Sequence, residues 1–165
     1  MMPLVSVIVN CFNGERFLQE AIESIYSQTY TNWEIIFWDN ASTDSSAIIA
    51  KSFDDKLRYF LAPKMTPLGE ARNLALNNAK GKYVAFLDCD DLYLPDKIQK
   101  QIQLMEKNKF VMSYGSSITI NEDNKEIRRL NVKNQSGYMF NFLLKHYEIN
   151  MQSVMLLKSY LIEKG

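Results

Sequence analysis

The chain has few of the residues that mark several large classes of protein. Among its 165 residues are only two cysteines, Cys11 and Cys89, with no spacing typical of metal ligands or of a disulfide framework. This indicates reduced thiols in a cytoplasmic protein. Its 19 basic and 19 acidic residues cancel, so no charge excess indicates binding to nucleic acid or to an anionic membrane. We therefore expect no nucleic-acid partner.

Long apolar segments are also missing. No run approaches the roughly 20 apolar residues that span a bilayer, and the N-terminus lacks the basic region and cleavage pattern of a secretory signal. His146 is the only histidine, and a lone histidine on a helix is more often packed or exposed than catalytic. The remaining composition, with 47% hydrophobic residues, is that of an ordinary globular domain.

Short apolar runs alternate along the chain with segments of helical spacing. This rhythm predicts right-handed βαβ units and therefore an α/β fold with a mostly parallel sheet. A hairpin turn is expected at residues 121–124. The expected strands are residues 4–9, 33–38, 57–61, 83–87, 110–114 and 154–157, and the expected helices are residues 17–28, 48–53, 71–79, 95–105 and 137–147.

Polar residues follow the ends of three expected strands. Residues 10–15 follow the first strand, Asp39 follows the second, and Asp88 and Asp90 follow the strand at 83–87. Ligands bind parallel sheets at the carboxyl ends of the strands, so these residues are expected on one rim. Alternation along an extended segment would point Asp88 and Asp90 the same way and Cys89 the other way. The sequence predicts a nucleotide and divalent-metal site, with helix caps or solvated turns as the alternative.

The same segments resemble the motifs of family 2 glycosyltransferases, which have the GT-A fold. Residues 5–13 are similar to the first strand and nucleotide loop of that family, and residues 38–44 to its second acidic turn. Residues 69–73 resemble its Arg-Asn helix start, and residues 86–91 its DxD motif. The resemblance runs from about residue 3 to residue 96 in the correct order and spacing.

The resemblance implies a Rossmann-like, three-layer α/β/α GT-A fold with a mostly parallel sheet. A single domain over 3–165 is expected, in which residues 3–96 bind a nucleotide sugar. Residues 97–165 would begin an acceptor half that is truncated.

Roles for individual residues also follow from the resemblance. Phe12 would lie against uracil or another base, with a core aromatic as the alternative. Asp39 would hydrogen-bond the base, or else cap a helix. Arg72 would reach the base or the diphosphate, unless it is a solvated helix residue. Asp88 would bind the ribose or a metal-bound water, and Asp90 would ligate Mn²⁺ or Mg²⁺.

Three further residues complete the implied substrate site. These are Asn10, Cys89 and Glu15, although an acid at position 15 also suits the dipole of the following helix. The sequence departs from the family pattern where Asn10 and Cys11 replace the usual Pro-Thr pair. It departs again where Met65 and Pro67 stand in place of Asn and Gly.

The activity implied is that of a metal-dependent, inverting glycosyltransferase. It would transfer a sugar from a nucleoside-diphosphate sugar, most simply a UDP-sugar, to a hydroxyl of a glycan or lipid-linked acceptor in surface-polysaccharide synthesis. A cytoplasmic protein is implied, with peripheral membrane attachment through a region not present in this chain.

No residue matches the catalytic base of the family. Glu122, Asp123 and Glu148 are stand-ins that we interpret first as exposed loop acids. Two alternatives remain open: a non-catalytic nucleotide-sugar-binding domain, and a phosphatase with Asp88 as nucleophile and Asp90 as acid/base. Such a phosphatase usually carries its DxD motif on the first strand, whereas here three strands come first.

Overall fold

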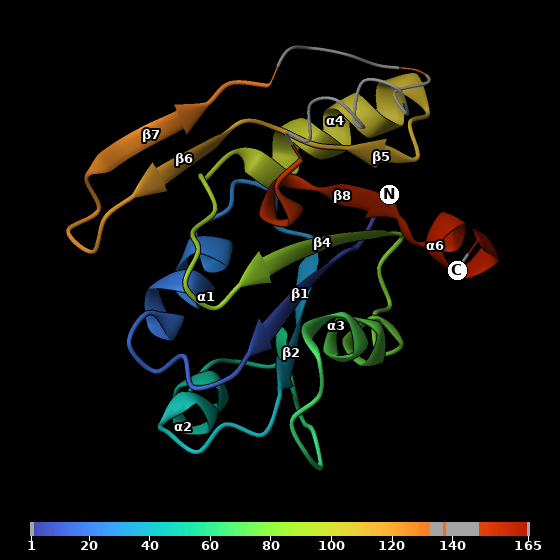
Figure 1. Ribbon diagram of the computed structural model, residues 1–165. Helices are drawn as coiled ribbons and strands as arrows, with labels where there is room; N and C mark the ends of the chain where they lie inside the picture. Colours follow the sequence, from blue (N-terminus) through green and yellow to red (C-terminus); the bar gives the residue numbers. More distant parts are fainter. Residues whose placement is uncertain (1, 133–136, 138–148, 165) are drawn as a thin grey trace.

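A six-stranded sheet with helices on both faces forms the centre of the molecule (Figure 1). The structure is a computed structural model and describes residues 2–132, 137 and 149–164. The strands of this sheet are β1 (Val5–Cys11), β2 (Trp33–Asp39), β3 (Leu57–Leu61), β4 (Tyr83–Asp88), β5 (Met112–Ser113) and β8 (Met155–Leu157). Their order is β3-β2-β1-β4-β8-β5. The first four strands are parallel, and β8 runs antiparallel to both β4 and β5.

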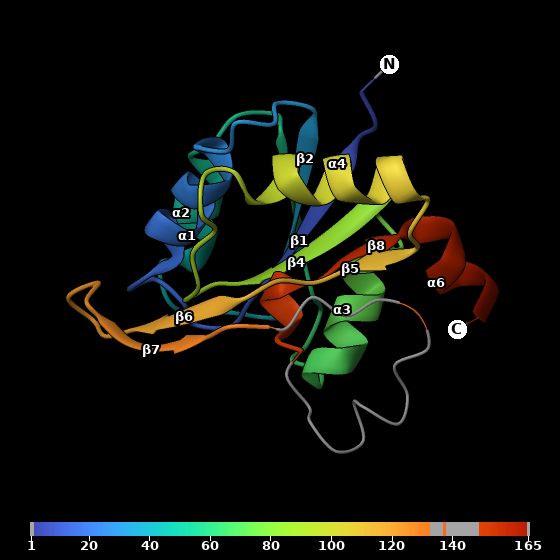
Figure 2. The same cartoon turned by 90° about the horizontal axis from the view of Figure 1, so that it is seen from above.

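Helices cover the two faces of the sheet and give three layers, as predicted (Figure 2). On one face lie α1 (Leu18–Tyr26), α2 (Ser46–Lys51) and α4 (Lys97–Asn108), and on the other lies α3 (Leu68–Leu76). A short turn of 3₁₀ helix, η1 (Met151–Ser153), precedes β8, and α6 (Lys158–Lys164) follows it. None of the described helices is long and apolar enough to cross a membrane.

The buried residues show how the helices on each face pack against the sheet. All residues of β1 and β2 are buried, because helices cover both faces of these central strands. On the α3 face, the small side chains of Ala71, Ala75 and Ala79 pack against Ile8, Ile36 and Val84 of the sheet. On the other face, the apolar sides of α1 and α4 pack over the strands.

A buried polar network fixes the start of β4. Ser6 Oγ donates to Glu34 Oε1 at 2.7 Å and accepts the Gly81 N–H at 2.8 Å. A Cβ atom at Gly81 would lie 2.6 Å from the backbone nitrogen of Ser6, so only glycine allows this approach. Glu34 also accepts the backbone N–H of Lys80 at 2.7 Å and pairs with Arg58 at 3.0 Å.

The remaining elements test the other sequence predictions. The turn at 121–124 is confirmed, because it joins β6 (Ser117–Ile120) and β7 (Glu126–Leu130) in an antiparallel hairpin. The helix expected from residue 95 begins at Lys97, and the strand expected over 110–114 shortens to β5. Lys109, with φ of 57°, ends α4 in a left-handed conformation and delays the strand. The helix expected over 137–147 lies almost wholly outside the described residues.

The strand order reverses beside β1. The chain moves outward from β1 to β2 and β3, then returns to place β4 on the other side of β1. Asn10 of β1 and Asp88 of β4 are register partners at the carboxyl ends of these strands. Such a reversal opens a crevice at the end of a parallel sheet, and the site is therefore expected there.

Candidate functional site

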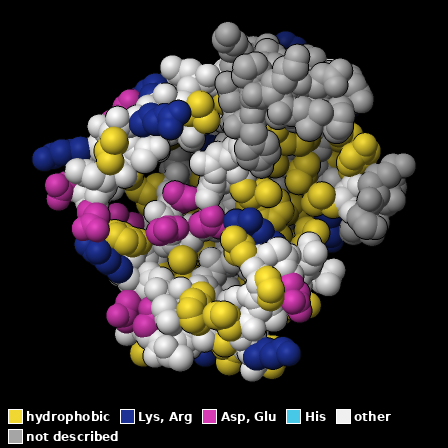
Figure 3. Space-filling model, in the orientation of Figure 1, with side chains coloured by type: hydrophobic (Ala, Val, Ile, Leu, Met, Phe, Trp, Pro, Cys, Tyr) yellow, Lys and Arg dark blue, Asp and Glu magenta, His cyan; other side chains and the backbone are white. Residues whose placement is uncertain are grey.

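The carboxyl ends of three strands bring the expected polar residues together. Asn10 pairs in register with Asp88 on one side and Trp38 on the other, and Cys11 pairs with Asp39. Four segments that are far apart in the sequence thus meet at one rim, since Arg72 from α3 also reaches it. Figure 3 shows acidic side chains gathered at the centre of this face, beside a hollow lined by hydrophobic side chains.

Two side chains from opposite halves of the chain hold Asp88. Arg72 pairs with its Oδ1 at 2.8 Å, and the side-chain amide of Gln152 in η1 donates to its Oδ2 at 2.5 Å. The Arg72 and Asp88 side chains are both largely buried. Asp88 is therefore an oriented carboxylate, and its charge is compensated from the α3 side of the sheet.

The predicted alternation of side chains does not reach Asp90. Strand β4 ends at Asp88, and a turn follows in which the Asp91 N–H bonds to the Asp88 carbonyl at 3.1 Å. Strand geometry, from which Asp88 and Asp90 were predicted to share a direction, therefore does not apply at Asp90, because the backbone is no longer extended there. Asp90 is exposed and makes no hydrogen bond or ion pair within the described part of the chain.

Carboxylates crowd this turn. Burial and, to a smaller extent, the neighbouring charges of Asp90 and Asp88 together raise the pKa of Asp91 to about 6. Among the described residues no group of three or more His, Cys, Asp and Glu is arranged to hold a metal ion. Mg²⁺ and similar ions are commonly held by one or two carboxylates together with substrate phosphates. The residues therefore fit a divalent ion that Asp90 would ligate and whose coordination a bound diphosphate would complete.

On the other side of the rim, Phe12 and Asp39 differ sharply in exposure. The Phe12 side chain is 47% exposed, so it is not the core aromatic of the alternative interpretation. Asp39 is fully buried, and its oxygens accept the Ser42 N–H at 2.7 Å and the Tyr59 hydroxyl at 2.6 Å. Asn10 is also buried, and its Nδ2 has no partner among the described residues.

Two loops at this end of the sheet are bonded to each other. The Glu15 carboxylate accepts the Ser45 N–H at 2.9 Å, and the Glu15 N–H donates to Asp44 at 2.9 Å. Asn13, with φ of 52°, accepts the Thr43 N–H at 2.8 Å. Glu15 thus ties the first loop to the second, and this contact accounts for its acidic side chain without a ligand.

Cys89 faces the opposite side of the sheet from Asp88. Its side chain lies with that of Cys11 against Gly14, and both thiols are free. A hydrogen bond from Cys89 lowers the pKa of Cys11 to about 7, and the same contact raises the pKa of Cys89. The structure therefore separates the Cys89 side chain from the rim where Arg72 and Asp88 meet.

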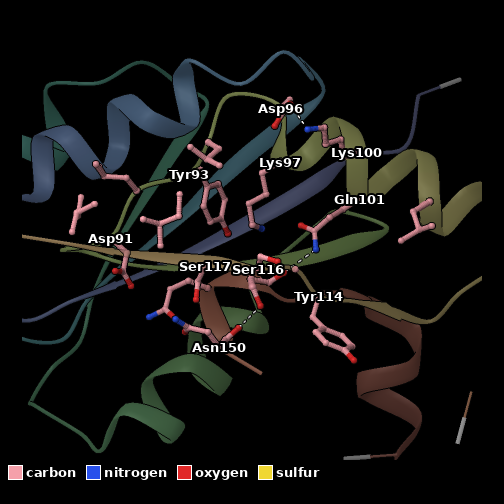
Figure 4. Close-up of a pocket in the computed structure, with 18 of the residues that line it drawn as sticks. Asp91, Tyr93, Asp96, Lys97, Lys100, Gln101, Tyr114, Ser116, Ser117 and Asn150 are labelled. Carbon is pink, nitrogen blue, oxygen red and sulfur yellow. Dashed lines mark hydrogen bonds and ion pairs between the residues drawn. The ribbon is translucent and has the colours of Figure 1, made fainter. Parts of the chain in front are cut away.

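A cavity of about 610 Å³ opens beside Asp90 (Figure 4). It lies between α4, the segment before β6 and the residues of η1, and apolar side chains including Leu92, Leu104 and Ile118 form much of its wall. Figure 4 shows Lys97, Tyr93 and Gln101 directed toward Ser116 and Ser117. Further lining residues are Asp90, Asp91, Tyr114, Asn150, Gln152 and Ser153.

Unpartnered polar atoms are concentrated in this cavity. Among the described residues, five buried side-chain atoms lack a hydrogen-bond partner, and three of them belong to lining residues: Lys97 Nζ, Gln101 Oε1 and Gln152 Oε1. The Lys97 ammonium lies 3.9 Å from the centre of the Tyr93 ring. Burial lowers the pKa of Lys97 to about 7. Buried polar groups are normally paired, so these three atoms indicate a polar occupant.

Two of the expected stand-ins for a catalytic base, Glu122 and Asp123, do not line this cavity. Glu122 is exposed and forms an ion pair with Arg16 at 2.5 Å. Asp123 is exposed in the hairpin turn, and Glu148 and His146 lie outside the described residues.

Sequence reasoning also missed residues that the site uses. Gln152 comes from a segment 64 residues after Asp88 and carries no local motif. Lys97 and Gln101 could have been found, because they are polar residues one helical turn apart, next to the buried Ile98 and Ile102.

Comparison with known proteins agrees with this geometry. Residues 6–163 match the family described as Glycosyl transferase family 2. An uncharacterized glycosyltransferase of Rickettsia felis is 40% identical over 153 residues, which are 92% of this chain and 25% of that protein. The UDP-Glc:alpha-D-GlcNAc-diphosphoundecaprenol beta-1,3-glucosyltransferase WfgD of Escherichia coli is 35% identical over 121 residues, 73% of this chain and 48% of that protein.

Solved structures share the fold. S. aureus TarS 1–349 in complex with UDP-GlcNAc superposes with a TM-score of 0.82 at 19% identity, over 96% of this chain and 46% of that chain. The mannosyltransferase PcManGT from Pyrobaculum calidifontis, in complex with GDP-Man and Mn²⁺, superposes with a TM-score of 0.71 at 21% identity, over 100% of this chain and 47% of that chain. The chain spans about a quarter of the length of the first curated relatives that it matches. By its sequence match over residues 6–163 and its GT-A fold, the chain belongs to glycosyl transferase family 2.

Proposed function

We propose that this chain carries the donor site of a metal-dependent, inverting glycosyltransferase. The enzyme would transfer a sugar from a nucleoside-diphosphate sugar, with UDP-sugar as the expected donor, to an acceptor hydroxyl. The observation that carries the proposal is the exposed, unpaired Asp90 carboxylate beside the oriented Asp88, at the point where the strand order reverses. We place the reaction in the cytoplasm, with the protein peripheral to the membrane.

The nucleoside would occupy the side of the rim that carries Phe12. Its half-exposed ring offers an apolar surface on which a base can stack, an interaction worth about 1–3 kcal/mol per base. Asn10 Nδ2 is buried without a partner and could donate to the nucleoside. Asp39 accepts two hydrogen bonds already, so its main contribution is to hold the loop that borders the base.

The diphosphate would lie between Arg72 and the acidic turn. Arg72 is a fixed cation that can offset negative charge on the leaving group. Asp90 would ligate Mn²⁺ or Mg²⁺, and Asp88 would bind the ribose or a metal-bound water. When bound, the divalent ion supplies charge neutralisation on the departing diphosphate. The Mn²⁺ in the PcManGT complex supports this assignment.

We propose the cavity beside Asp90 as the site of the acceptor sugar. Hydroxyl groups of a sugar can donate to Gln101 Oε1 and Gln152 Oε1 and can accept from Lys97, which would satisfy all three unpartnered atoms. The apolar wall suits a sugar face or a neighbouring lipid. WfgD is named for a diphosphoundecaprenol-linked acceptor, which supports a glycan or lipid-linked acceptor here.

The catalytic base remains unassigned. An inverting enzyme needs a group within hydrogen-bond reach of the acceptor hydroxyl, normally a carboxylate. A non-catalytic nucleotide-sugar-binding domain is therefore the second candidate. Family membership argues against the aspartyl phosphatase, as do the two hydrogen bonds that occupy the Asp88 carboxylate.

Calorimetric titration with UDP, with and without Mn²⁺, tests the donor site. We expect metal-dependent binding that the double variant Asp88→Ala/Asp90→Ala loses. The matched control is Asp55→Ala, which removes an exposed carboxylate far from the rim and should bind UDP as the unaltered chain does. Failure of the unaltered chain to bind UDP or any other nucleoside diphosphate would refute the proposal. Release of a nucleoside diphosphate in the presence of an acceptor would then separate a transferase from a binding domain.

A further inference from the structure

The only two cysteines of the chain lie side by side at the reversal of strand order. Cys11 ends β1, and Cys89 directly follows the last residue of β4. Because Asn10 and Asp88 are register partners, the two cysteines stand one residue beyond a paired position on neighbouring strands. A Cβ atom at Gly14 would lie 2.8 Å from the Cys11 sulfur and 2.7 Å from the Cys89 sulfur. Both sulfurs therefore fill the space that this glycine leaves.

This arrangement fits the requirements of a disulfide. Asn10 and Asp88, the residues just before the two cysteines, lie on neighbouring strands about 4.8 Å apart, which is within the range of about 4.4–6.8 Å between the Cα atoms of bonded cysteines. Both sulfurs lie within 2.8 Å of one point, the position that a Cβ atom of Gly14 would take, so the two thiols are neighbours. Cys89 is partly exposed and open to a reagent, whereas Cys11 is only 2% exposed.

We propose that Cys11 and Cys89 form an oxidation site, closed to a disulfide by a small-molecule disulfide, and that closure weakens donor binding. The Cys89 thiol, the more exposed of the two, exchanges with the reagent RSSR: its sulfur bonds to one SR group, and its proton leaves with the other SR group as RSH. The Cys11 thiolate then attacks the Cys89 sulfur, forms the Cys11–Cys89 bond and releases the second RSH. The protein loses two hydrogen atoms and two electrons, and RSSR is reduced to two RSH.

The effect on the donor site follows from the position of Cys89 between Asp88 and Asp90. Unbonded sulfurs stand about 3.5 Å or more apart, and a disulfide bond is about 2.05 Å long. Closure therefore brings the two sulfurs about 1.5 Å closer together, and it pulls on the turn that carries both Cys89 and Asp90. Metal-ligand distances tolerate only about 0.2 Å. The step from oxidation to weaker binding rests on the proposed function, whereas disulfide formation does not.

The test oxidises the purified chain with oxidised glutathione. Intact mass and thiol counting are expected to show loss of two hydrogens and of both free thiols, reversed by dithiothreitol. Binding of UDP in the presence of Mn²⁺ is expected to weaken at least about tenfold in the oxidised chain and to recover on reduction. Each variant is compared with itself before and after oxidation.

Cys11→Ser and Cys89→Ser separate the steps. Cys11→Ser should retain one glutathione on Cys89, since no second thiol can displace it, and Cys89→Ser should react far more slowly. Stable glutathione adducts on the unaltered chain, or thiols that stay free, would overturn the oxidation site. A disulfide that leaves UDP binding unchanged would overturn its effect on the donor site. If the reduced chain does not bind UDP, the donor proposal fails, and the mass measurement still decides whether the disulfide forms.

Discussion

Gln152 offers a test of how the two halves of the chain build one site. Its side-chain amide donates to Asp88 Oδ2, while its Oε1 is buried without a partner among the described residues. Gln152→Leu preserves the size of the side chain, removes the hydrogen bond to Asp88 and also removes the unpartnered oxygen. We therefore expect a loss of function with little loss of stability.

The magnitude follows from the charge on Asp88. A hydrogen bond to a charged group contributes about 1.5–3 kcal/mol. If most of this contribution stabilises the UDP-bound state, its loss in Gln152→Leu should lower the affinity for UDP in the presence of Mn²⁺ by roughly 10- to 100-fold. Calorimetric titration measures the affinity, and thermal unfolding of the same samples measures stability.

The control is Gln103→Leu, the same substitution at an exposed position of α4. It should change neither affinity nor the unfolding temperature. The reasoning would be refuted by a folded Gln152→Leu variant whose affinity for UDP stays within about twofold of the unaltered chain. A large drop in unfolding temperature would show instead that Gln152 acts mainly through the stability of the fold.

Two further substitutions test buried charges. Burial raises the pKa of Glu34, but hydrogen bonds from Ser6, Lys80 and Arg58 outweigh it and hold the pKa below 4.5. The contribution of Glu34 to stability is therefore complete above pH 4.5 and is lost as pH falls through the lowered pKa. Glu34→Gln should lower the free energy of unfolding at pH 7, measured by urea titration, by about 3 kcal/mol. A decrease of less than about 1 kcal/mol would contradict this expectation. Lys97, with a pKa near 7, binds its proton less readily in the folded chain, so stability should rise between pH 7 and pH 10. Lys97→Met should abolish that rise in pH-dependent unfolding, and an unchanged slope would contradict the assignment.

The first half of the fold could be predicted because its signals are local. Each strand from β1 to β4 is an apolar run that ends in polar turn residues, and α1 and α4 each have a clear apolar face. The parallel order then requires Asp39 and Asp88 to meet at one edge. The GT-A fold and the family were confirmed for these reasons.

The second half depends on contacts that sequence patterns do not encode. Strand β8 has only three residues and inserts between β4 and β5, strands that precede it by many residues. The position of β8 depends on its antiparallel pairing with β4. The position of Gln152, which lies just before β8, depends on the same pairing. The direction of Asp90 could not be predicted from strand alternation, because the strand ends at Asp88 and a turn does not keep the two-residue period of a strand.

The insertion of β8 has a practical consequence for anyone who trims this protein. A fragment ending near residue 96 would contain every recognisable donor motif, yet β4 would become an open edge with unpaired backbone amides and carbonyls. Val84 and Ala85, now fully buried, would lose their covering strand. Such a fragment would be prone to aggregation and would fail in binding assays for reasons unrelated to its motifs. The smallest unit that can report on nucleotide binding therefore extends through Leu157.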